Sequence, residues 1–150
     1  MNAQMFYEIN NLLCSFFAAF DKREWSLMST CLAPQVFIDY ASSGRDHPEL
    51  IDKHEFIRRR SDSPDKLSKQ HSFSNLHIAG ESEDPSITAS CNYLILRFAT
   101  NPATGDDFYH SCGQYRFQLK RHGHEWVIAA ILQSQLRSWG NPTLHTPTSA

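Results

Sequence analysis

The sequence has little of what marks the most easily recognised protein classes. Its 150 residues contain no run approaching the ~20 apolar residues of a membrane-spanning helix, so we expect no membrane association. No G-x-G-x-x-G, P-loop or G-x-S-x-G motif occurs, which leaves nucleotide cofactors and serine hydrolysis without a recognisable site. The four cysteines are widely spaced and form no C-x-x-C pair, which favours free thiols in a reducing cytoplasm.

Charge of one sign is also scarce. The formal net charge is −2 at pH 7, and the longest basic run, residues 58–60, is followed at once by Ser-Asp. Nucleic-acid binding needs a broad basic face, so we do not expect it. The only close pairs of metal-ligand residues are His110-x-Cys112 and His122-x-His124, neither with a partner set, so we expect no metal and no other cofactor. The N-terminus lacks a basic region typical of signal peptides, which also favours a cytoplasmic protein.

Helical periodicity dominates the first third of the chain. Six apolar residues recur at the spacing of one helix face and predict a helix ending near residue 22: Ile9, Leu12, Leu13, Phe16, Phe17 and Phe20. A second helix follows from about Trp25 and is expected to stop at Pro34. Asp52, with Glu55 three residues later, predicts the start of a third, short helix that ends near residue 60.

From residue 71 onward the period changes to two. Four strands are predicted at 71–79, 87–100, 106–121 and 126–138, after a short strand at 36–40. Helices followed by an antiparallel meander predict an α+β domain over residues 1–140, with a flexible tail at 141–150. We expect the outer face of the last strands, including Ile131 and Leu132, to associate with a second copy, as a dimer or trimer.

Five separated segments resemble one family in their order and spacing: residues 20–25 (FDKREW), 32–40 (LAPQVFIDY), His71, 113–126 (Gly-x-Tyr through Trp) and 139–142 (WGNP). Over about residues 5–142 the chain is similar to the SnoaL-like and scytalone dehydratase-like proteins of the NTF2-like superfamily. That resemblance implies a cone, in which a curved mixed or antiparallel sheet and about three N-terminal helices enclose a pocket. It also implies a cofactor-free lyase, isomerase or cyclase acting on polyketide- or terpenoid-like compounds, as in secondary metabolism.

The resemblance carries three site residues over directly. Asp21, Tyr40 and His71 match the acid, a tyrosine and one histidine of the dehydratase. Phe20 stands where the dehydratase has a second tyrosine, and Arg97 where it has a second histidine. Positions 113 and 115 hold glycine and tyrosine in place of its serine and asparagine, so we do not expect scytalone itself to be the substrate.

The chemistry of these residues suits proton abstraction. A histidine with a pKa near 6.5 can accept and return a proton, which makes His71 the expected general base, with Asp21 orienting its ring. Tyr40 is expected to donate a hydrogen bond to a carbonyl or enolate oxygen, and Arg97 to hold a similar group. The residues expected to contact a hydrophobic small-molecule substrate are Phe20, Tyr93, Ile95, Arg97 and Tyr115. The expected reaction removes a C–H proton beside a carbonyl.

Each assignment has an alternative. Asp21 with Glu24 would make a good capping box for the second helix, and His71 could be a polar strand end. Arg97 could lie exposed on an alternating strand. The whole protein could be a non-catalytic ligand-binding or scaffold subunit, like the β subunit of ring-hydroxylating dioxygenases, if aromatic side chains fill the cone.

Overall fold

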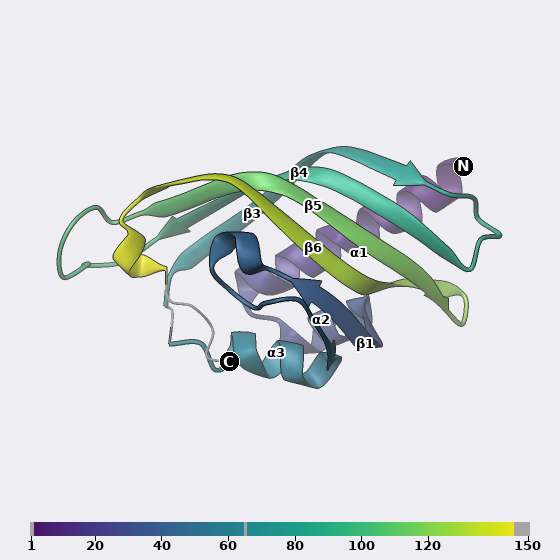
Figure 1. Cartoon of the computed structure of the whole chain (residues 1–150), viewed down its shortest axis with the longest axis horizontal. Helices are drawn as coiled ribbons and strands as arrows, with labels where there is room; N and C mark the ends of the chain where they lie inside the picture. The colour runs from purple at the N-terminus through teal and green to yellow at the C-terminus, as the bar shows by residue number, and fades with distance from the viewer. Residues whose placement is uncertain (1, 65, 146–150) are drawn as a thin grey trace.

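The computed structural model describes residues 2–64 and 66–145, which form three helices, two short 3-10 turns and one sheet (Figure 1). The helices are α1 (Ala3–Lys22), α2 (Trp25–Cys31) and α3 (Lys53–Ser61). The strands are β1 (Leu32–Asp39), β2 (Glu49–Asp52), β3 (Ser68–Ala79), β4 (Ser86–Phe98), β5 (Tyr109–His122) and β6 (Glu125–Gly140). The 3-10 turns are η1 (Ala41–Ser43) and η2 (Pro142–Leu144).

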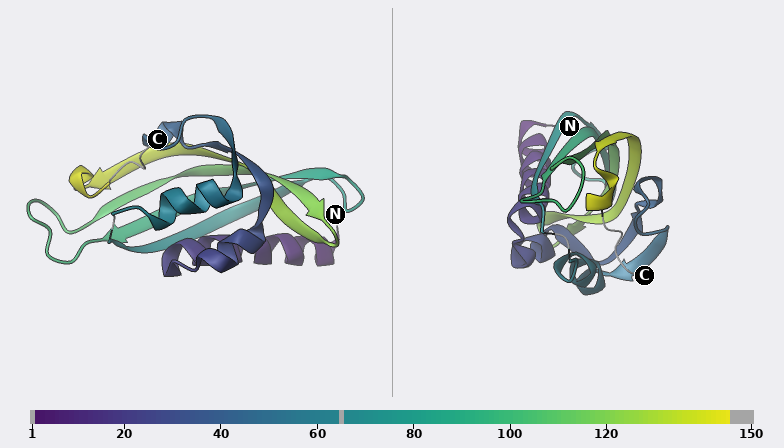
Figure 2. Two further views of the ribbon diagram at one scale, coloured as in Figure 1. Left: turned by 90° about the horizontal axis from the view of Figure 1, so that it is seen from below. Right: turned by 90° about the vertical axis from the view of Figure 1, so that its left-hand side faces the viewer.

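The sheet is mixed and has the order β2-β1-β6-β5-β4-β3. Only β1 and β6 run parallel, and every other neighbouring pair is antiparallel. Seen from its end, the sheet curls, and the three helices cover its concave side (Figure 2). This arrangement confirms the predicted α+β class and the predicted long meander at the C-terminal half.

The first helix anchors the core. Asn2 caps its start by accepting a hydrogen bond from the backbone N–H of Met5 at 2.8 Å. Its apolar stripe is buried as predicted, and the Phe16 ring lies 6.0 Å from that of Phe117 on β5. Arg23, with φ at 55°, ends the helix in the left-handed conformation and turns the chain into α2. This packing fixes the last turn of α1 against the inner face of the sheet.

Two short elements differ from the prediction. Helix α2 ends at Cys31, and Pro34 lies inside β1 rather than stopping the helix. Strand β2 was not predicted, because four residues at the edge of a sheet give almost no periodic signal. Asp52 does cap α3, as expected, by accepting a hydrogen bond from the backbone N–H of His54 at 2.7 Å.

The outer face of β6 also differs from expectation. Ile131 is wholly buried in the core, so it was wrongly assigned to an outward surface, and Leu132 is half-buried. The run 128–132 is too apolar for the alternation to be read from the sequence. Leu136, 82% exposed, is the large apolar side chain that β6 presents to solvent. Association as a dimer or trimer stays a prediction.

The segment predicted as a flexible tail begins within the folded unit. Residues 141–145 are described, and Asn141 caps η2 by accepting a hydrogen bond from the backbone N–H of Thr143. The side chain of His145 reaches the main pocket, where its Nε2 lies 3.0 Å from the backbone oxygen of Ser43. Residues 146–150 lie outside the described residues. No helix in the described part of the chain combines the length and apolarity needed to cross a membrane.

Candidate active site

An aspartate at the end of α1 meets a histidine on β3. The Asp21 carboxylate accepts a hydrogen bond from the backbone N–H of His71, at 2.9 and 3.1 Å to its two oxygens. One of these oxygens also lies 2.5 Å from Nδ1 of the His71 ring. The capping alternative for Asp21 is therefore wrong: Glu24 is the N-cap of α2, and it makes no side-chain capping bond.

The position of this carboxylate is unfavourable for the helix alone. Asp21 lies in the last turn of α1, where the helix dipole presents its negative end and disfavours another negative charge. The contacts from His71 offset that cost with charge-assisted hydrogen bonds. A carboxylate kept at the wrong end of a helix and tied to a histidine is more typical of a functional pair than of a structural cap.

The His71 ring is held in one orientation by its neighbours. Phe17 and Phe20 stack on the ring, with centroids at 5.7 and 5.1 Å. Because Nδ1 faces a carboxylate, the neutral ring carries its proton on Nδ1, and Nε2 on the opposite edge is a bare acceptor. Burial lowers the pKa of His71 below 6.5, Asp21 opposes that shift, and the positive charges of Arg97 and Lys69 add to it. The ring is consequently neutral at pH 7 and ready to accept a proton.

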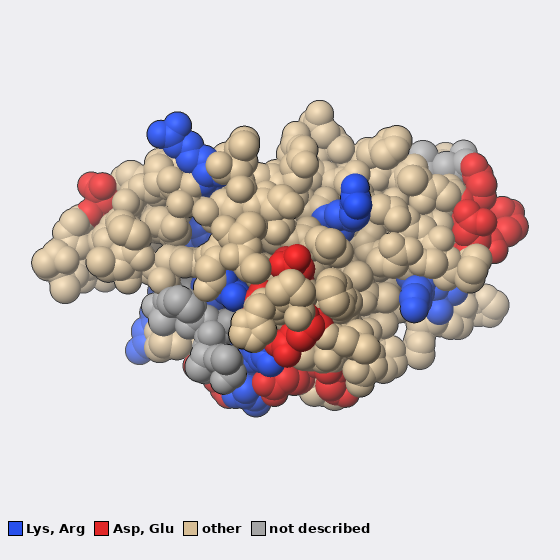
Figure 3. Space-filling view, viewed as in Figure 1, with Lys and Arg blue, Asp and Glu red and all other residues tan. Residues whose placement is uncertain are grey.

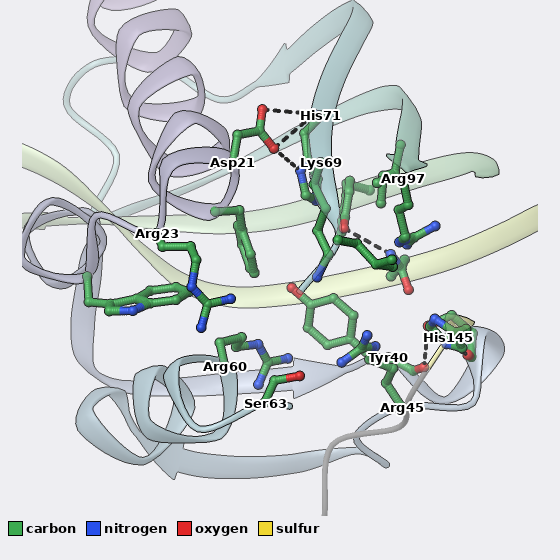
Figure 4. Close-up of a pocket in the computed structure, with 17 residues that line it drawn as sticks. Asp21, Arg23, Tyr40, Arg45, Arg60, Ser63, Lys69, His71, Arg97 and His145 are labelled. Atoms are coloured by element: carbon green, nitrogen blue, oxygen red, sulfur yellow. Dashed lines mark hydrogen bonds and ion pairs between the residues drawn. The ribbon is translucent and has the colours of Figure 1, made fainter. Parts of the chain in front are cut away.

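A pocket opens beside this pair (Figure 4). Its cavity has a volume of about 70 Å³, and the described residues that line it come from helices, strands and loops alike. They are Phe20, Asp21, Arg23, Trp25, Tyr40, Ser43, Arg45, Arg60, Ser63, Leu67, Lys69, His71, Ile95, Arg97, Tyr115, Gln133 and His145. Seven of the eight predicted site residues are among them. Tyr93 is not among them; its ring packs against that of Tyr115, with the two centroids 4.7 Å apart.

Tyr40 enters the pocket from the end of β1. It is almost fully buried, and its hydroxyl has no acceptor for its proton in the described part of the chain, although the Arg60 guanidinium lies beside the ring. Burial raises the pKa of Tyr40 to about 12, against the opposing influence of the Arg60 charge. The group is therefore a protonated donor at neutral pH, and a buried donor without a partner is a candidate for contact with a ligand.

Arg97 is also buried, at 7% exposure, which makes the exposed-strand alternative wrong. Its Nη1 donates hydrogen bonds to Oγ of Ser111 at 3.0 Å and to the backbone oxygen of Tyr109 at 3.4 Å. Its guanidinium group also lies 5.7 Å from the centroid of the Tyr109 ring. Arg97 is thus a buried cation in the lining of the pocket, held on β4 by groups of β5.

Other lining residues were missed in the sequence. Gln133 donates a hydrogen bond to the Tyr115 hydroxyl at 2.9 Å. It lies two residues after the buried Ile131 on β6, so the strand period of two would have indicated that its side chain faces inward. Arg60 donates to the buried Asp46 carboxylate at 2.6 Å, and its guanidinium lies over the Phe56 ring. That contact joins residues 14 positions apart in a loop and a helix, and no local pattern signals it. Residues 2–64 and 66–145 contain no group of three or more histidine, cysteine or acidic side chains placed to hold a metal ion.

These features define a class of protein: an α+β cone whose pocket contains a carboxylate-oriented histidine. The sequence matches the model of the SnoaL-like domain over residues 5–131, and the chain belongs to that family. The predicted membership is confirmed. Among curated proteins, none matches the sequence significantly.

Solved structures of the same fold include both enzymes and a subunit. A proposed scytalone dehydratase from Novosphingobium aromaticivorans superposes with a TM-score of 0.77 at 10% identity, over 97% of this chain and 91% of that one. A hexachlorocyclohexane dehydrochlorinase, LinA type 2, superposes with a TM-score of 0.74 at 11% identity, over 95% and 93%. The β subunit of a proposed aromatic-ring-hydroxylating dioxygenase from N. aromaticivorans gives 0.64 at 14% identity, over 87% and 90%. At such identities these similarities show the fold alone.

Proposed function

We propose that the protein is an acid–base enzyme that removes a C–H proton beside a carbonyl group, with His71 as general base. The single observation that carries this proposal is the contact of Nδ1 of His71 with the Asp21 carboxylate at the edge of a pocket. It leaves a basic Nε2 on the edge of the ring away from Asp21, and the ring belongs to a residue that lines the pocket and is neutral at pH 7. Dehydration, dehydrohalogenation, isomerisation and cyclisation can all start from this step.

The step balances within the pocket. The substrate C–H bond breaks, its proton goes to Nε2 of His71, and its electron pair moves to the carbonyl oxygen as an enolate. Asp21 stabilises the imidazolium that forms, as the carboxylate of a catalytic triad does. Tyr40 donates its hydroxyl proton in a hydrogen bond to the enolate oxygen. His71 then returns the proton to a leaving group or to another carbon.

A second candidate is a non-catalytic subunit, favoured by the aromatic filling of the cone. Phe17 contacts the rings of Tyr115 and Phe117 at 5.5 and 6.1 Å, and these two rings stack at 5.3 Å. The remaining cavity, about 70 Å³, is small. It accommodates the reacting part of a substrate, whereas the rest of a polycyclic molecule would extend through the mouth.

Solvent deuterium exchange distinguishes the two candidates. The full chain is incubated in D₂O with a panel of aromatic and alicyclic ketones and keto acids, and loss of the α-proton signal is followed by NMR. We expect exchange of at least one compound above the buffer rate, reduced ~10²–10⁴-fold in His71→Asn.

The matched control is His77→Asn, because His77 is exposed on the same strand and far from Asp21 in register. Its exchange rate should equal that of the wild type. Full exchange by a folded His71→Asn protein would remove His71 as the base. Absence of exchange across the panel, together with a stable complex with another subunit, would support the scaffold candidate.

A further inference from the structure

Five side-chain polar atoms in the described part of the chain are buried without a hydrogen-bond partner, and three of them belong to residues that line the pocket beside His71. These three are the Tyr40 hydroxyl, Oε1 of Gln133 and Nδ1 of His145. Folded proteins leave few buried polar groups unpaired, so three around one cavity require an explanation. Because the atoms are enclosed, bulk water does not satisfy them either.

The three residues are grouped by one short turn, η1. Tyr40 directly precedes this turn. The Ser42 hydroxyl donates a hydrogen bond to the backbone oxygen of Gln133 at 2.8 Å. The backbone oxygen of Ser43 lies 3.0 Å from Nε2 of His145. Figure 4 shows Tyr40 and His145 on the same side of the pocket, so the unsatisfied atoms belong to one wall.

The hydrogen bonds that His145 and Gln133 do make define their unsatisfied atoms as acceptors. A backbone carbonyl can only accept, so Nε2 of His145 carries the ring proton and Nδ1 is bare. Burial is the main cause that lowers the pKa of His145 to about 4, so the ring keeps this neutral form at pH 7. Gln133 donates an amide N–H to the Tyr115 hydroxyl at 2.9 Å, which leaves its Oε1 as a second acceptor.

The missing partner is therefore a hydrogen-bond donor. A hydroxyl group suits this wall, because it donates a proton to an acceptor without carrying a charge. A protonated amine suits it less, because it would meet the positive charges that already help to lower the pKa of His145. Those charges are on Arg45, Lys69 and Arg97. On the face of the molecule drawn in Figure 3, side chains of both signs intermingle around α3, so that surface has no such excess of positive charge.

We propose that Gln133 and His145 are specificity-determining residues, which accept hydrogen bonds from a hydroxyl group of the substrate while Tyr40 donates to its carbonyl oxygen. The inference rests on the proposed function and adds the substrate class to it: an aromatic or alicyclic carbonyl compound that bears a hydroxyl group. When such a ligand fills the cavity, small rotations of the Gln133 amide and the His145 ring bring the enclosed acceptors to the hydroxyl. Neither residue lies in the segments that resemble the family, so this selection is a property of the present chain.

The test uses phenol and fluorobenzene, two ligands of nearly equal shape that have no acidic C–H and cannot react. Phenol is neutral at pH 7 and has a proton to donate, whereas fluorobenzene has none. Because phenol is the more strongly hydrated of the two, a purely apolar cavity would prefer fluorobenzene. Binding to the full chain is followed by ¹H–¹⁵N NMR titration of the backbone amides of residues 42–45 and 132–135. We expect phenol to bind about tenfold more tightly, and this preference to fall about threefold or more in Gln133→Leu and in His145→Phe.

Matched controls remove the same chemical groups elsewhere. Gln114→Leu changes an exposed glutamine of β5, and His122→Phe changes an exposed histidine at the end of that strand. Both variants should keep the wild-type preference for phenol. The fluorobenzene affinity of each variant is the internal reference, because a general distortion of the pocket weakens both ligands, whereas loss of an acceptor weakens phenol alone.

A second readout requires no change to the pocket. In two-bond ¹H–¹⁵N spectra of the wild-type protein, Nδ1 of His145 should give the signal of an unprotonated ring nitrogen. Saturation with phenol should shift this signal toward that of a hydrogen-bonded nitrogen, and fluorobenzene should leave it in place. The signal is assigned by its absence from the spectrum of His145→Phe.

The outcomes separate this inference from the proposed function. Four results would each overturn the acceptor role, even if deuterium exchange of ketones occurs: equal affinity for both ligands, no phenol binding at millimolar concentrations, a preference that survives both substitutions, or an Nδ1 signal of His145 that phenol does not move. Selective binding of phenol without any exchange chemistry would leave the hydroxyl site in place and remove the catalytic step.

Discussion

Two histidines in this molecule have similar surroundings and opposite kinds of hydrogen-bond partner. His71, on β3, and His110, on β5, are both largely buried among aromatic rings. His110 lies between Phe98, Phe108 and Trp139, with centroids at 5.0, 4.8 and 5.6 Å. The difference is at Nδ1. In His71 this nitrogen faces the Asp21 carboxylate, whereas in His110 it accepts the backbone N–H of Arg97 at 3.1 Å.

The partner of Nδ1 decides what each ring can do. A carboxylate places the proton on Nδ1 of His71 and leaves Nε2 basic. In His110, Nδ1 accepts a hydrogen bond from a backbone N–H group, so Nδ1 carries no proton and the ring proton is on Nε2. A protonated Nε2 cannot accept a further proton, so this nitrogen cannot act as a base. Burial and aromatic packing therefore do not distinguish the two rings, whereas the chemical nature of the partner of Nδ1 does.

The largest effect is expected from making His71 resemble His110. In Asp21→Asn the amide group offers an N–H donor to Nδ1, which would move the ring proton to Nε2 and block the base. We expect the rate of α-proton exchange to fall ~10³–10⁴-fold, as for the equivalent change in a triad. Asp106→Asn, at an exposed position, is the control, measured by the same NMR assay. An exchange rate within threefold of wild type would contradict the orienting role of Asp21.

The reverse perturbation, at His110, should affect stability instead of chemistry. His110→Phe keeps an aromatic ring but leaves the buried backbone N–H of Arg97 without its acceptor. We expect a loss of about 1–3 kcal/mol in the free energy of unfolding, measured by urea denaturation monitored by circular dichroism. Exchange activity below the unfolding transition should stay within about threefold of wild type. An unchanged midpoint would show that the Nδ1 contact contributes nothing.

Removing the Tyr40 hydroxyl from the pocket lining should have an intermediate effect on exchange. Tyr40→Phe deletes a buried donor that has no partner, so the free protein should be as stable as the wild type or slightly more stable. The exchange rate should fall about tenfold or more, because the enolate oxygen loses its donor. Rate and melting temperature are measured on the same sample. A loss of stability equal to that of His110→Phe would indicate a structural role for the hydroxyl.

The pH dependence of stability sharpens the comparison further. The folded protein lowers the pKa of His71 below its unfolded value of about 6.5, so the unfolded chain binds more protons as the pH falls. The stabilisation is complete above pH 6.5 and is lost as the pH falls through the lower, folded pKa. His145, whose pKa is lowered to about 4 chiefly by burial, adds a contribution of the same sign. In His71→Asn, urea midpoints between pH 7 and pH 5 should decline less steeply than in the wild type.

The last test changes nothing in the protein and detects the tautomers of the two histidine rings directly. Two-bond ¹H–¹⁵N correlation spectra at pH 7.5 should show a protonated Nδ1 in His71 and a protonated Nε2 in His110. The signals are assigned with the His71→Asn and His110→Phe variants. The same tautomer in both rings would invalidate the comparison on which the other predictions rest.

The sequence could predict the long elements and the pairing of Asp21 with His71. The apolar stripe of α1 and the alternation of the four long strands each repeat over many residues. The structure confirms the helix and the four strands that these patterns predict. His71 and Asp21 lie 50 residues apart, and only the resemblance to a family connected them; helix periodicity alone allowed Asp21 to be a cap. The partner of Asp21 is His71, and the two meet because the C-terminal end of α1 packs next to β3. That placement is set by tertiary packing, which the local sequence pattern does not reveal.

The rest of the pocket could not be predicted, for identifiable reasons. Arg45 and Arg60 reach it from a loop and from the end of a short helix, and neither segment has a period that gives direction to a side chain. Ile131 was placed on the outside because a continuous apolar run has no alternation to read. Tyr93 was predicted to contact the substrate, and its side chain is buried as an inward position requires, but it packs against the ring of Tyr115 and does not line the pocket.

The contact between Asp21 and the backbone of His71 has a consequence for solubility as well. Strand β3 is at the edge of the sheet, and its outward N–H groups are exposed to pairing with any extended chain. The Asp21 carboxylate covers one of these donors with a negative charge. The carboxylate that contacts the His71 ring thus also occupies one backbone donor of an edge strand. A chain without this carboxylate would present one more unpaired backbone N–H group at the edge of β3.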